Sequence, residues 1–290
     1  MRWVVDMSLE ELSPSPALSV RGASLRFADR TLWADLEFDV SAGEFIAVLG
    51  PNGAGKTSLL RVLLGLQPLT AGTVEIMGRR PRRGNSDVGY VPQQKGFDRD
   101  IPLRGRDLVR LGLDGHRWGV PMPSRSARRR VQEAIEAVAA DSFADAPVGS
   151  LSGGEQQRLR IAQALLGAPG LLLCDEPLLS LDLHHQQVVT ELIDAHRRAT
   201  ATAVLLVTHE VNPVLPVVDR ILYLAGGRWA IGTPDQVMTS QTLSDLYGAN
   251  VDVLRIRDRY VVVGAPDAVV SEPGDSHHHH VPDAATPGIF

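Results

Sequence analysis

The glycine-rich stretch "GPNGAGKT", Gly50 to Thr57, has the residue types and spacing that point most directly to chemistry. It fits the pattern G-x-x-x-x-G-K-[ST], follows the apolar segment "FIAVL" and precedes the helix-forming "SLLRVLLGL". Glycines here let backbone N–H groups surround phosphate oxygens, Lys56 brings a positive charge to the terminal phosphates, and the Thr57 hydroxyl is a magnesium ligand. A plain glycine turn is the alternative, but the flanking strand and helix patterns favour phosphate binding.

Two carboxylates end another apolar segment, "LLLCDEP". Ligands of α/β proteins bind at the carboxyl ends of parallel strands, so Asp175 is a candidate to hold magnesium through water. Glu176 is then the candidate to orient or deprotonate an attacking water. A helix cap after a buried strand is the alternative, which the phosphate-binding loop disfavours. Cys174 is expected to be an inert core residue, because no base is evident beside it.

Two further polar residues follow strand-like segments. His209 ends "VLLVTHE" and can donate a hydrogen bond to a terminal phosphate or to water, although capping the next helix is an alternative. Gln93, in "YVPQQ", lies where a strand gives way to a segment of different composition. It is a candidate to contact magnesium or water there, although by itself it is an ordinary loop glutamine.

The segment "LSGGEQQ", Leu151 to Gln157, predicts a helix start. Ser152 is placed as the N-cap and Glu155 as the residue that completes the reciprocal capping box. Gly153 and Gly154 are costly in a first turn, which indicates that another group approaches this backbone. Because the N-terminus of a helix attracts anions, the segment is a candidate for a second phosphate site.

The elements that must position these residues follow from the pattern along the chain. Strand-like segments, turns and one helix run from Ala17 to about Gly78, and a helix is predicted in "SRSARRRVQEAIEAVAA" within an Arg- and Ala-rich insert. Buried-strand runs resume in "GLLLCDEP" and "ATAVLLVTHE", which are typical of a parallel sheet. A short helix and the alternating "YVVVG" precede a Pro-, Gly- and Ser-rich tail from Ala265. The pattern predicts an α/β fold.

Composition narrows the possible functions. The net charge of −5 disfavours a nucleic-acid binder, although the basic run Arg79 to Arg83 leaves a local patch open. One cysteine excludes an internal disulfide framework and suits a reducing compartment. The acidic start lacks the apolar run of a signal peptide, and no apolar run reaches the roughly 18 residues of a membrane helix. We therefore expect a soluble chain, or one held at a membrane by a partner.

Taken in order, the Gly50 to Thr57 loop, Gln93, "LSGGEQ", "CDEP", "SLD" at Ser180 to Asp182 and His209 resemble the nucleotide-binding subunit of an ATP-binding cassette (ABC) transporter, from about Leu18 to Gly248. The resemblance implies a P-loop NTPase core with a mostly parallel sheet, an antiparallel β subdomain and a helical insert subdomain. The implied division is a leader over 1–16, the ATP-binding core over 17–95 and 151–240, the insert over 96–150, a C-terminal extension over 241–264 and a disordered tail over 265–290.

The same resemblance implies the ligands and their residues. ATP and Mg²⁺ are the expected cofactors, Glu176, His209 and Gln93 the catalytic residues, and Thr57, Gln93 and Asp175 the magnesium site. In that family the "LSGGEQ" helix faces ATP held by a second subunit, so two copies enclose two ATPs. Phe27 takes the place of an adenine-stacking aromatic that is more often tyrosine, and Gln163 replaces a common arginine. The implied nucleotide contacts are Phe27, Gly50, Pro51, Asn52, Gly53, Ala54, Gly55, Lys56, Thr57, Ser58, Ser152, Gly153, Gly154, Glu155 and Asp182.

The cargo is suggested by weaker features. Asp98, Asp100 and Pro102 after the glutamine, and "TLSDLYGANVDVL" near the end, are similar to zinc and manganese importers. That resemblance implies a separate membrane permease, an extracytoplasmic solute-binding protein, no nucleic acid, and a peripheral location at the cytoplasmic face of the membrane. Siderophore or vitamin import is the nearest alternative, and a DNA-repair or translation ATPase or an assembly scaffold are more distant ones. The run His277 to His280 is either a solvated tail or a metal-binding segment.

Overall fold

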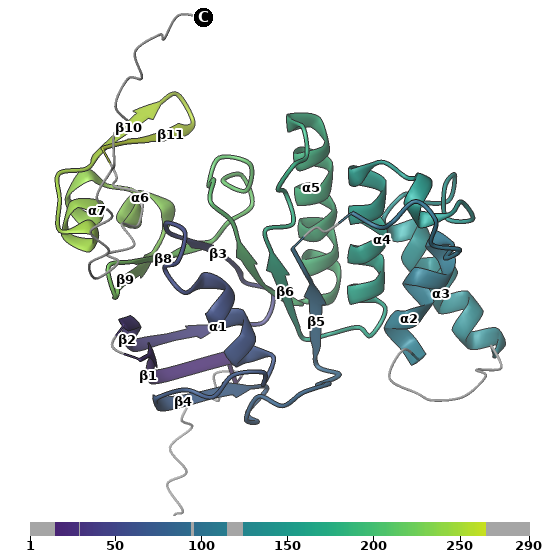
Figure 1. Ribbon diagram of the computed structural model, residues 1–290, viewed down its shortest axis with the longest axis horizontal. Helices are drawn as coiled ribbons and strands as arrows, with labels where there is room; N and C mark the ends of the chain where they lie inside the picture. The colour runs from purple at the N-terminus through teal and green to yellow at the C-terminus, as the bar shows by residue number, and fades with distance from the viewer. Residues whose placement is uncertain (1–14, 29, 94–95, 115–123, 265–290) are drawn as a thin grey trace, which may run out of the picture.

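The computed structural model describes residues 15–28, 30–93, 96–114 and 124–264 (Figure 1). The expected leader up to residue 14, the tail over 265–290 and His277 to His280 lie outside the described residues.

A six-stranded sheet forms the centre of the chain, and all its strands are parallel except the last, which is antiparallel to its neighbour. Its order in space is β5 (Val88–Val91), β6 (Leu171–Asp175), β7 (Ala203–Val207), β3 (Phe45–Leu49), β8 (Arg220–Ala225) and β9 (Arg228–Gly232). Strands β3, β6 and β7 are buried throughout, which explains why their sequences are continuous apolar runs. The predicted α/β fold is confirmed.

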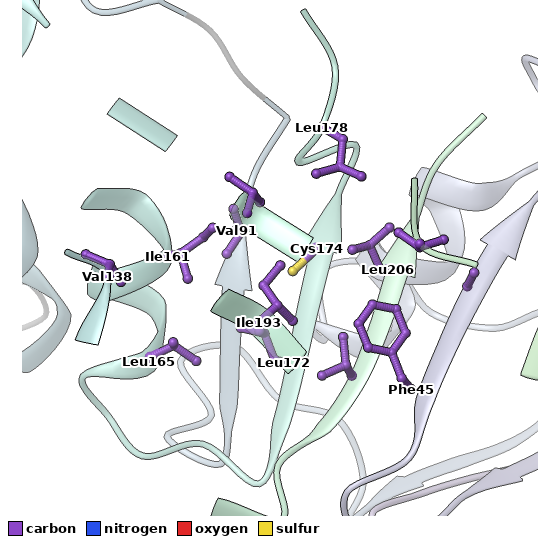
Figure 2. Packing of buried hydrophobic residues seen from close by; sticks show 14 of the residues in the cluster. Phe45, Val91, Val138, Ile161, Leu165, Leu172, Cys174, Leu178, Ile193 and Leu206 are labelled. Atoms are coloured by element: carbon purple, nitrogen blue, oxygen red, sulfur yellow. The ribbon is translucent and has the colours of Figure 1, made fainter. Parts of the chain in front are cut away.

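Side chains alternate between the two faces of this sheet and so divide the core in two. On β6, Leu172 and Cys174 face one cluster and Leu171 and Leu173 the other. The first cluster receives α4 (Gly153–Leu165) and α5 (Leu183–Thr200), as Figure 2 shows for Ile161 and Ile193. The second receives α1 (Lys56–Leu63), so helices cover both faces of the sheet.

A separate antiparallel sheet packs with α1 in the second cluster. It consists of β1 (Leu18–Phe27), β2 (Arg30–Val40) and β4 (Ala71–Ile76), in the order β2-β1-β4. Trp33, Leu18 and Leu36 are fully buried between this sheet and α1. The sheet therefore supports the helix that follows the glycine-rich loop.

Helices dominate the segment between β5 and β6. The helix predicted in "SRSARRRVQEAIEAVAA" is present as α3 (Arg125–Ala137), capped by the Ser124 hydroxyl, with Val131 and Ile135 buried. It packs beside α2 (Gly105–Asp114) and α4 (Figure 1). A Cβ at Gly112 would overlap the Gln163 carbonyl oxygen, so glycine lets α2 lie against α4. The short 3₁₀ helix η1 (Val148–Ser150) leads into α4.

Arg197, in the last turn of α5, joins three elements from inside the protein. Its Nε donates to Asp194 Oδ1 at 2.6 Å, and both side chains are 10% exposed. Its Nη1 donates to Gly43 O at 2.8 Å and to Asp219 Oδ2 at 2.7 Å, which places the guanidinium between the segments that lead into β3 and β8. The arginine thus fixes one end of α5 to the central sheet.

The chain ends in two short helices and a hairpin. These are α6 (Pro234–Val237), α7 (Ser240–Tyr247), β10 (Asp252–Ile256) and β11 (Arg259–Val263). The hairpin is tied to α7 by Ser240 Oγ, which accepts from Val253 N at 2.9 Å, and to α6 by the Tyr260 hydroxyl, which donates to Asp235 at 2.6 Å. It therefore forms part of the folded core of the chain.

Candidate functional site

The glycine-rich loop lies between β3 and α1, as its pattern predicts. Gly50, Gly53 and Gly55 have φ values of 141°, 76° and 93°, which disfavour residues with a Cβ. A Cβ at Gly50 would overlap the Leu224 carbonyl oxygen, and one at Gly55 would lie 2.8 Å from Trp33 Nε1. Glycine is thus required by both backbone conformation and close packing.

Lys56 begins α1 with its side chain turned back into the loop. Its Nζ donates to the carbonyl oxygens of Gly50 at 2.7 Å and Pro51 at 3.0 Å, and the residue is 6% exposed. Burial lowers the pKa of this ammonium, while the carboxylates of Glu176 and Asp175 oppose the shift. The loop therefore encloses one positive charge close to two negative ones.

Two pairs of polar side chains meet at the carboxyl ends of β5 and β6. Thr57 Oγ1 donates to Asp175 Oδ1 at 3.4 Å, and Gln93 Nε2 donates to Glu176 Oε2 at 3.0 Å. Burial, and then the charge of Glu176, raise the pKa of Asp175 above its usual range. Hydroxyl, amide and carboxylate oxygens are the ligands that magnesium prefers, and a buried anion with one weak donor gains from a cation. These residues fit magnesium.

Glu176 is held in an unusual backbone conformation. Its φ of 47° is left-handed, which few residues other than glycine adopt. The backbone N–H of Glu176 donates to Val207 O at 3.0 Å, so the end of β7 holds the residue in place. Strain of this kind occurs where a side chain must point in one direction, here toward Gln93.

A cavity of about 850 Å³ joins the start of the glycine-rich loop to Gln93 and Glu176, whereas Lys56, Thr57 and Asp175 lie outside its lining. His209, an exposed residue two positions after the end of β7, lines it together with the glycine-rich loop. The structure thus brings part of the glycine-rich loop together with Gln93, Glu176 and His209, although the sequence separates these four features widely. The lining includes Gly50, Pro51, Asn52, Gln93, Glu176 and His209.

Phe27 ends β1 and is 50% exposed. It pairs with Arg30 across the β1–β2 turn, and Arg30 Nη2 donates to Gly53 O at 3.0 Å. The antiparallel sheet thereby presents an exposed ring close to the glycine-rich loop. Arg30 and Trp33 were not expected at this site, because an arginine or tryptophan on a strand carries no motif of its own.

The predicted capping box at the start of α4 is confirmed. Ser152 Oγ accepts from Glu155 N, and Glu155 Oε2 accepts from Ser152 N at 2.8 Å and from its hydroxyl at 2.7 Å. These hydrogen bonds lower the pKa of Glu155. Among the described residues, none of the "LSGGE" positions lines the cavity, and Figure 1 shows α4 beyond α5 from α1.

Gly154 has a packing role besides the one that the sequence predicts. A Cβ there would lie 2.7 Å from His185 Cδ2, so the missing side chain makes room for an imidazole at the start of α5. His185 Nδ1 lies 2.8 Å from Asp182 Oδ2, and Asp182 caps α5 by accepting from His185 N at 2.9 Å. Two implied nucleotide contacts, Gly154 and Asp182, are thus joined through one histidine.

Comparison with known proteins identifies the family. The family described as ABC transporter matches residues 33–179. The chain is 33% identical to "Zinc import ATP-binding protein ZnuC 1" of Hahella chejuensis, over 82% of this chain and 86% of the relative. It is 29% identical to "Manganese transport system ATP-binding protein MntB" of Halalkalibacterium halodurans, over 86% and 99% of the two chains.

Solved structures agree with the sequence relatives. A chain of the structure described as "An inward-facing conformation of a putative metal-chelate type ABC transporter" superposes with a TM-score of 0.72 at 27% identity, covering 85% of this chain and 96% of the other. An ATP-binding cassette in its ADP conformation superposes with a TM-score of 0.69 at 16% identity, over 80% and 96%, which supports the fold alone. The chain therefore belongs to the ABC transporter family and is one of its ATP-binding subunits, an ATPase.

Proposed function

We propose that the chain hydrolyses ATP to drive import of a divalent metal, zinc or manganese, through a separate membrane permease. The observation that carries this proposal is the convergence of Gln93, Glu176 and His209 with the glycine-rich loop on one cavity, beside the charges of Lys56 and Asp175, in a chain whose relatives are named for zinc and manganese transport. The arrangement of the residues supports the ATPase activity, and the names of the relatives support the cargo.

The residues of the candidate site have different roles in hydrolysis. Lys56 and the N–H groups of the glycine-rich loop bind the phosphates, while Phe27 stacks on the base. Glu176, with Gln93 donating to its carboxylate, orients the attacking water and accepts its proton. His209 donates a hydrogen bond to the terminal phosphate. Mg²⁺, bound by Thr57, Asp175 and Gln93 beside the phosphates, would neutralise charge that develops during the transfer.

Among the described residues no group of three or more histidine, cysteine, aspartate or glutamate side chains is arranged to hold a metal. Mg²⁺ is usually held by one or two carboxylates and its substrate, so phosphate oxygens would complete the proposed magnesium site. We assign the binding of transported zinc or manganese to the permease and the solute-binding protein.

The start of α4 completes the site of a second copy. Its exposed Ser152 and Gly153 do not line the cavity of their own chain, which supports a role for them on a partner's ATP. Two copies would then enclose two nucleotides. His185 would make α4 and the Asp182 turn move together on closure.

The segment after Gln93 supports transmission of this movement to the permease. The Phe97 ring lies under the Arg160 guanidinium of α4 at 4.5 Å, and a Cβ at Gly149 would lie 2.7 Å from Arg99 Cα. The segment is thus packed directly against the approach to α4. We place the permease against these helices, at the cytoplasmic face of the membrane. Within the described part of the chain no helix has the length and apolarity to cross a bilayer.

The test is metal content and ATP turnover in the same variants. Deletion of the gene should lower cellular zinc or manganese in elemental analysis, and the wild-type chain should restore it. Glu176→Gln should bind ATP, accumulate as an ATP-dependent dimer and restore no metal, because it keeps the shape of Glu176 but cannot accept a proton. Lys56→Ala is the matched variant that should lose ATP binding itself.

Two outcomes would contradict different parts of the proposal. Turnover at the wild-type rate in Glu176→Gln would remove this residue from its role. Unchanged zinc and manganese with lost uptake of an iron chelate or a vitamin would change the cargo and leave the ATPase intact.

A further inference from the structure

The cavity that contains the glycine-rich loop has a second wall made by the C-terminal extension. Tyr260 and Val262 of β11 line it together with Gly50, Pro51 and His209. The hairpin thus lies beside the same cavity as the residues assigned to ATP, although it follows them by many residues in sequence. The contact between the hairpin and the loop after β7 explains this arrangement.

Asn212 joins that loop to the hairpin by two hydrogen bonds. Its Nδ2 donates to Tyr260 O at 3.0 Å, and its Oδ1 accepts from Tyr260 N at 2.9 Å. Tyr260 pairs with Arg255 across the hairpin, yet both its backbone groups are directed to Asn212, at the edge of β11 away from β10. The asparagine amide thus replaces a neighbouring strand at one position of that edge.

The loop over 208–213 is also restrained at Val211, which is buried in the first core cluster and whose carbonyl oxygen accepts from Val214 N at 3.0 Å. Its start is fixed by Thr208 N, which donates to Val48 O at 3.1 Å, and by the turn between Thr208 and Glu210. His209 is exposed, and within the described part of the chain no hydrogen bond or ion pair holds its imidazole. The direction of His209 therefore depends on the path of the backbone, which the buried Val211 and the bonded Asn212 fix two and three residues later.

The hairpin itself is a firm support. The Tyr260 hydroxyl and Arg255 Nη1 both bond Asp235 of α6 at 2.6 Å, and Ser244 Oγ accepts from Val251 N at 3.0 Å. Tyr260 is buried, with 6% of its surface exposed. If Asn212 moved, either the hairpin would move with it and lose its contacts with α6 and α7, or Asn212 would lose both of its hydrogen bonds to Tyr260.

We propose that the β10–β11 hairpin positions the loop that carries His209, and that Asn212 is the positioning residue through which it acts. The inference rests on the proposed role of His209 and adds a part of the chain that no catalytic motif includes. It makes the C-terminal extension a determinant of the rate of hydrolysis, while the binding of ATP depends on the glycine-rich loop.

The test is steady-state ATP hydrolysis by the purified full-length chain. Asn212→Ala should lower kcat by about 10- to 100-fold, the range expected for a small misplacement of a group at the reacting atoms, with the KM for ATP within about twofold. Tyr260→Pro removes one of the two hydrogen bonds through the backbone and should act in the same direction, since proline is tolerated at a strand edge. Tyr260→Phe keeps the ring and both backbone groups and loses the hydroxyl bond to Asp235, which Arg255 Nη1 still bonds, so it is the control that should retain kcat.

A double variant separates positioning from a general loss of structure. In a His209→Ala background, Asn212→Ala should lower kcat no further, because the residue it positions is absent. A decrease of kcat by the same factor in both backgrounds, or a wild-type kcat in Asn212→Ala and Tyr260→Pro, would overturn the inference. If Asn212→Ala does not fold, Tyr260→Pro against Tyr260→Phe decides it. A wild-type kcat in His209→Ala would also overturn the inference, because it would show that His209 does not have the role assigned to it.

Discussion

Replacement of Arg197 by methionine tests how the central sheet is held to α5. Methionine keeps most of the apolar stem and removes the guanidinium, which donates to Asp194, Asp219 and the carbonyl oxygen of Gly43. Asp194, 10% exposed, would keep its contact with the exposed Arg198 at 2.9 Å. The change therefore leaves a buried carboxylate without its buried partner.

The size of the effect follows from this burial. Removal of one partner of a buried ion pair costs about 3–5 kcal/mol, because the remaining buried charge loses its main partner and gains little water in exchange. Asp219 contributes less, since 46% of its side chain is exposed and water screens its contact with Arg197. With a fall of about 2–4 °C for each kcal/mol in a chain of this size, we expect the melting temperature to drop by roughly 6–20 °C.

Urea unfolding of the purified chain measures this change directly. Arg198→Met is the matched control, because it removes the other arginine that contacts Asp194. The side chain of Arg198 is 67% exposed. We expect a loss below about 1 kcal/mol for Arg198→Met and an unchanged m-value for both variants. Equal midpoints for the two variants would show that burial of Arg197 does not set its contribution.

Two further predictions concern the start of α4. Ser152→Arg should bind ATP as an isolated monomer but form no ATP-dependent dimer in size-exclusion chromatography. Ser152→Ala, which loses the same cap without added bulk, should still dimerise. If the Ser152→Arg monomer did not bind ATP, the phosphate that Ser152 contacts would belong to the same chain. Glu155→Gln should be less stable than wild type at pH 7. Because its hydrogen bonds to Ser152 lower the pKa of Glu155, that stabilisation is present above the ordinary value of 4.5 and is lost as pH falls through the folded-state value. Melting curves of both chains should converge in that range, and a constant difference down to pH 3 would contradict this.

Local features of the fold could be predicted well from the sequence. The glycine-rich loop, the capping box at Ser152 and the helix beginning after Ser124 each depend on residues within a few positions of one another. The buried strands could be predicted because parallel strands covered on both faces are continuous apolar runs. The residues that determine these features are close together in the sequence, so the features can be recognised without knowledge of distant contacts.

Features that depend on contacts between distant residues could not be predicted. The sequence around Gly154 indicates an opening for an anion, and nothing near it in sequence indicates that His185 packs there. Arg197 in a last helical turn is typical of a solvated side chain at the helix C-terminus, and only the fold brings Asp219 to it. Asn212 is an ordinary loop asparagine until β11 is placed beside it. Each of these needs the tertiary arrangement first.

The burial of Cys174 makes the chain suited to measurements with attached labels. It is the single cysteine of the sequence, has no exposed surface, and lies among Leu172, Ile193 and Leu206 in the middle of the core (Figure 2). Burial also raises the pKa of its thiol, which disfavours the reactive thiolate. A cysteine introduced at an exposed position would be the thiol that reagents reach in the folded protein. One spin label or fluorophore per copy could then report the distance between two copies as ATP is added, with the native cysteine left in place.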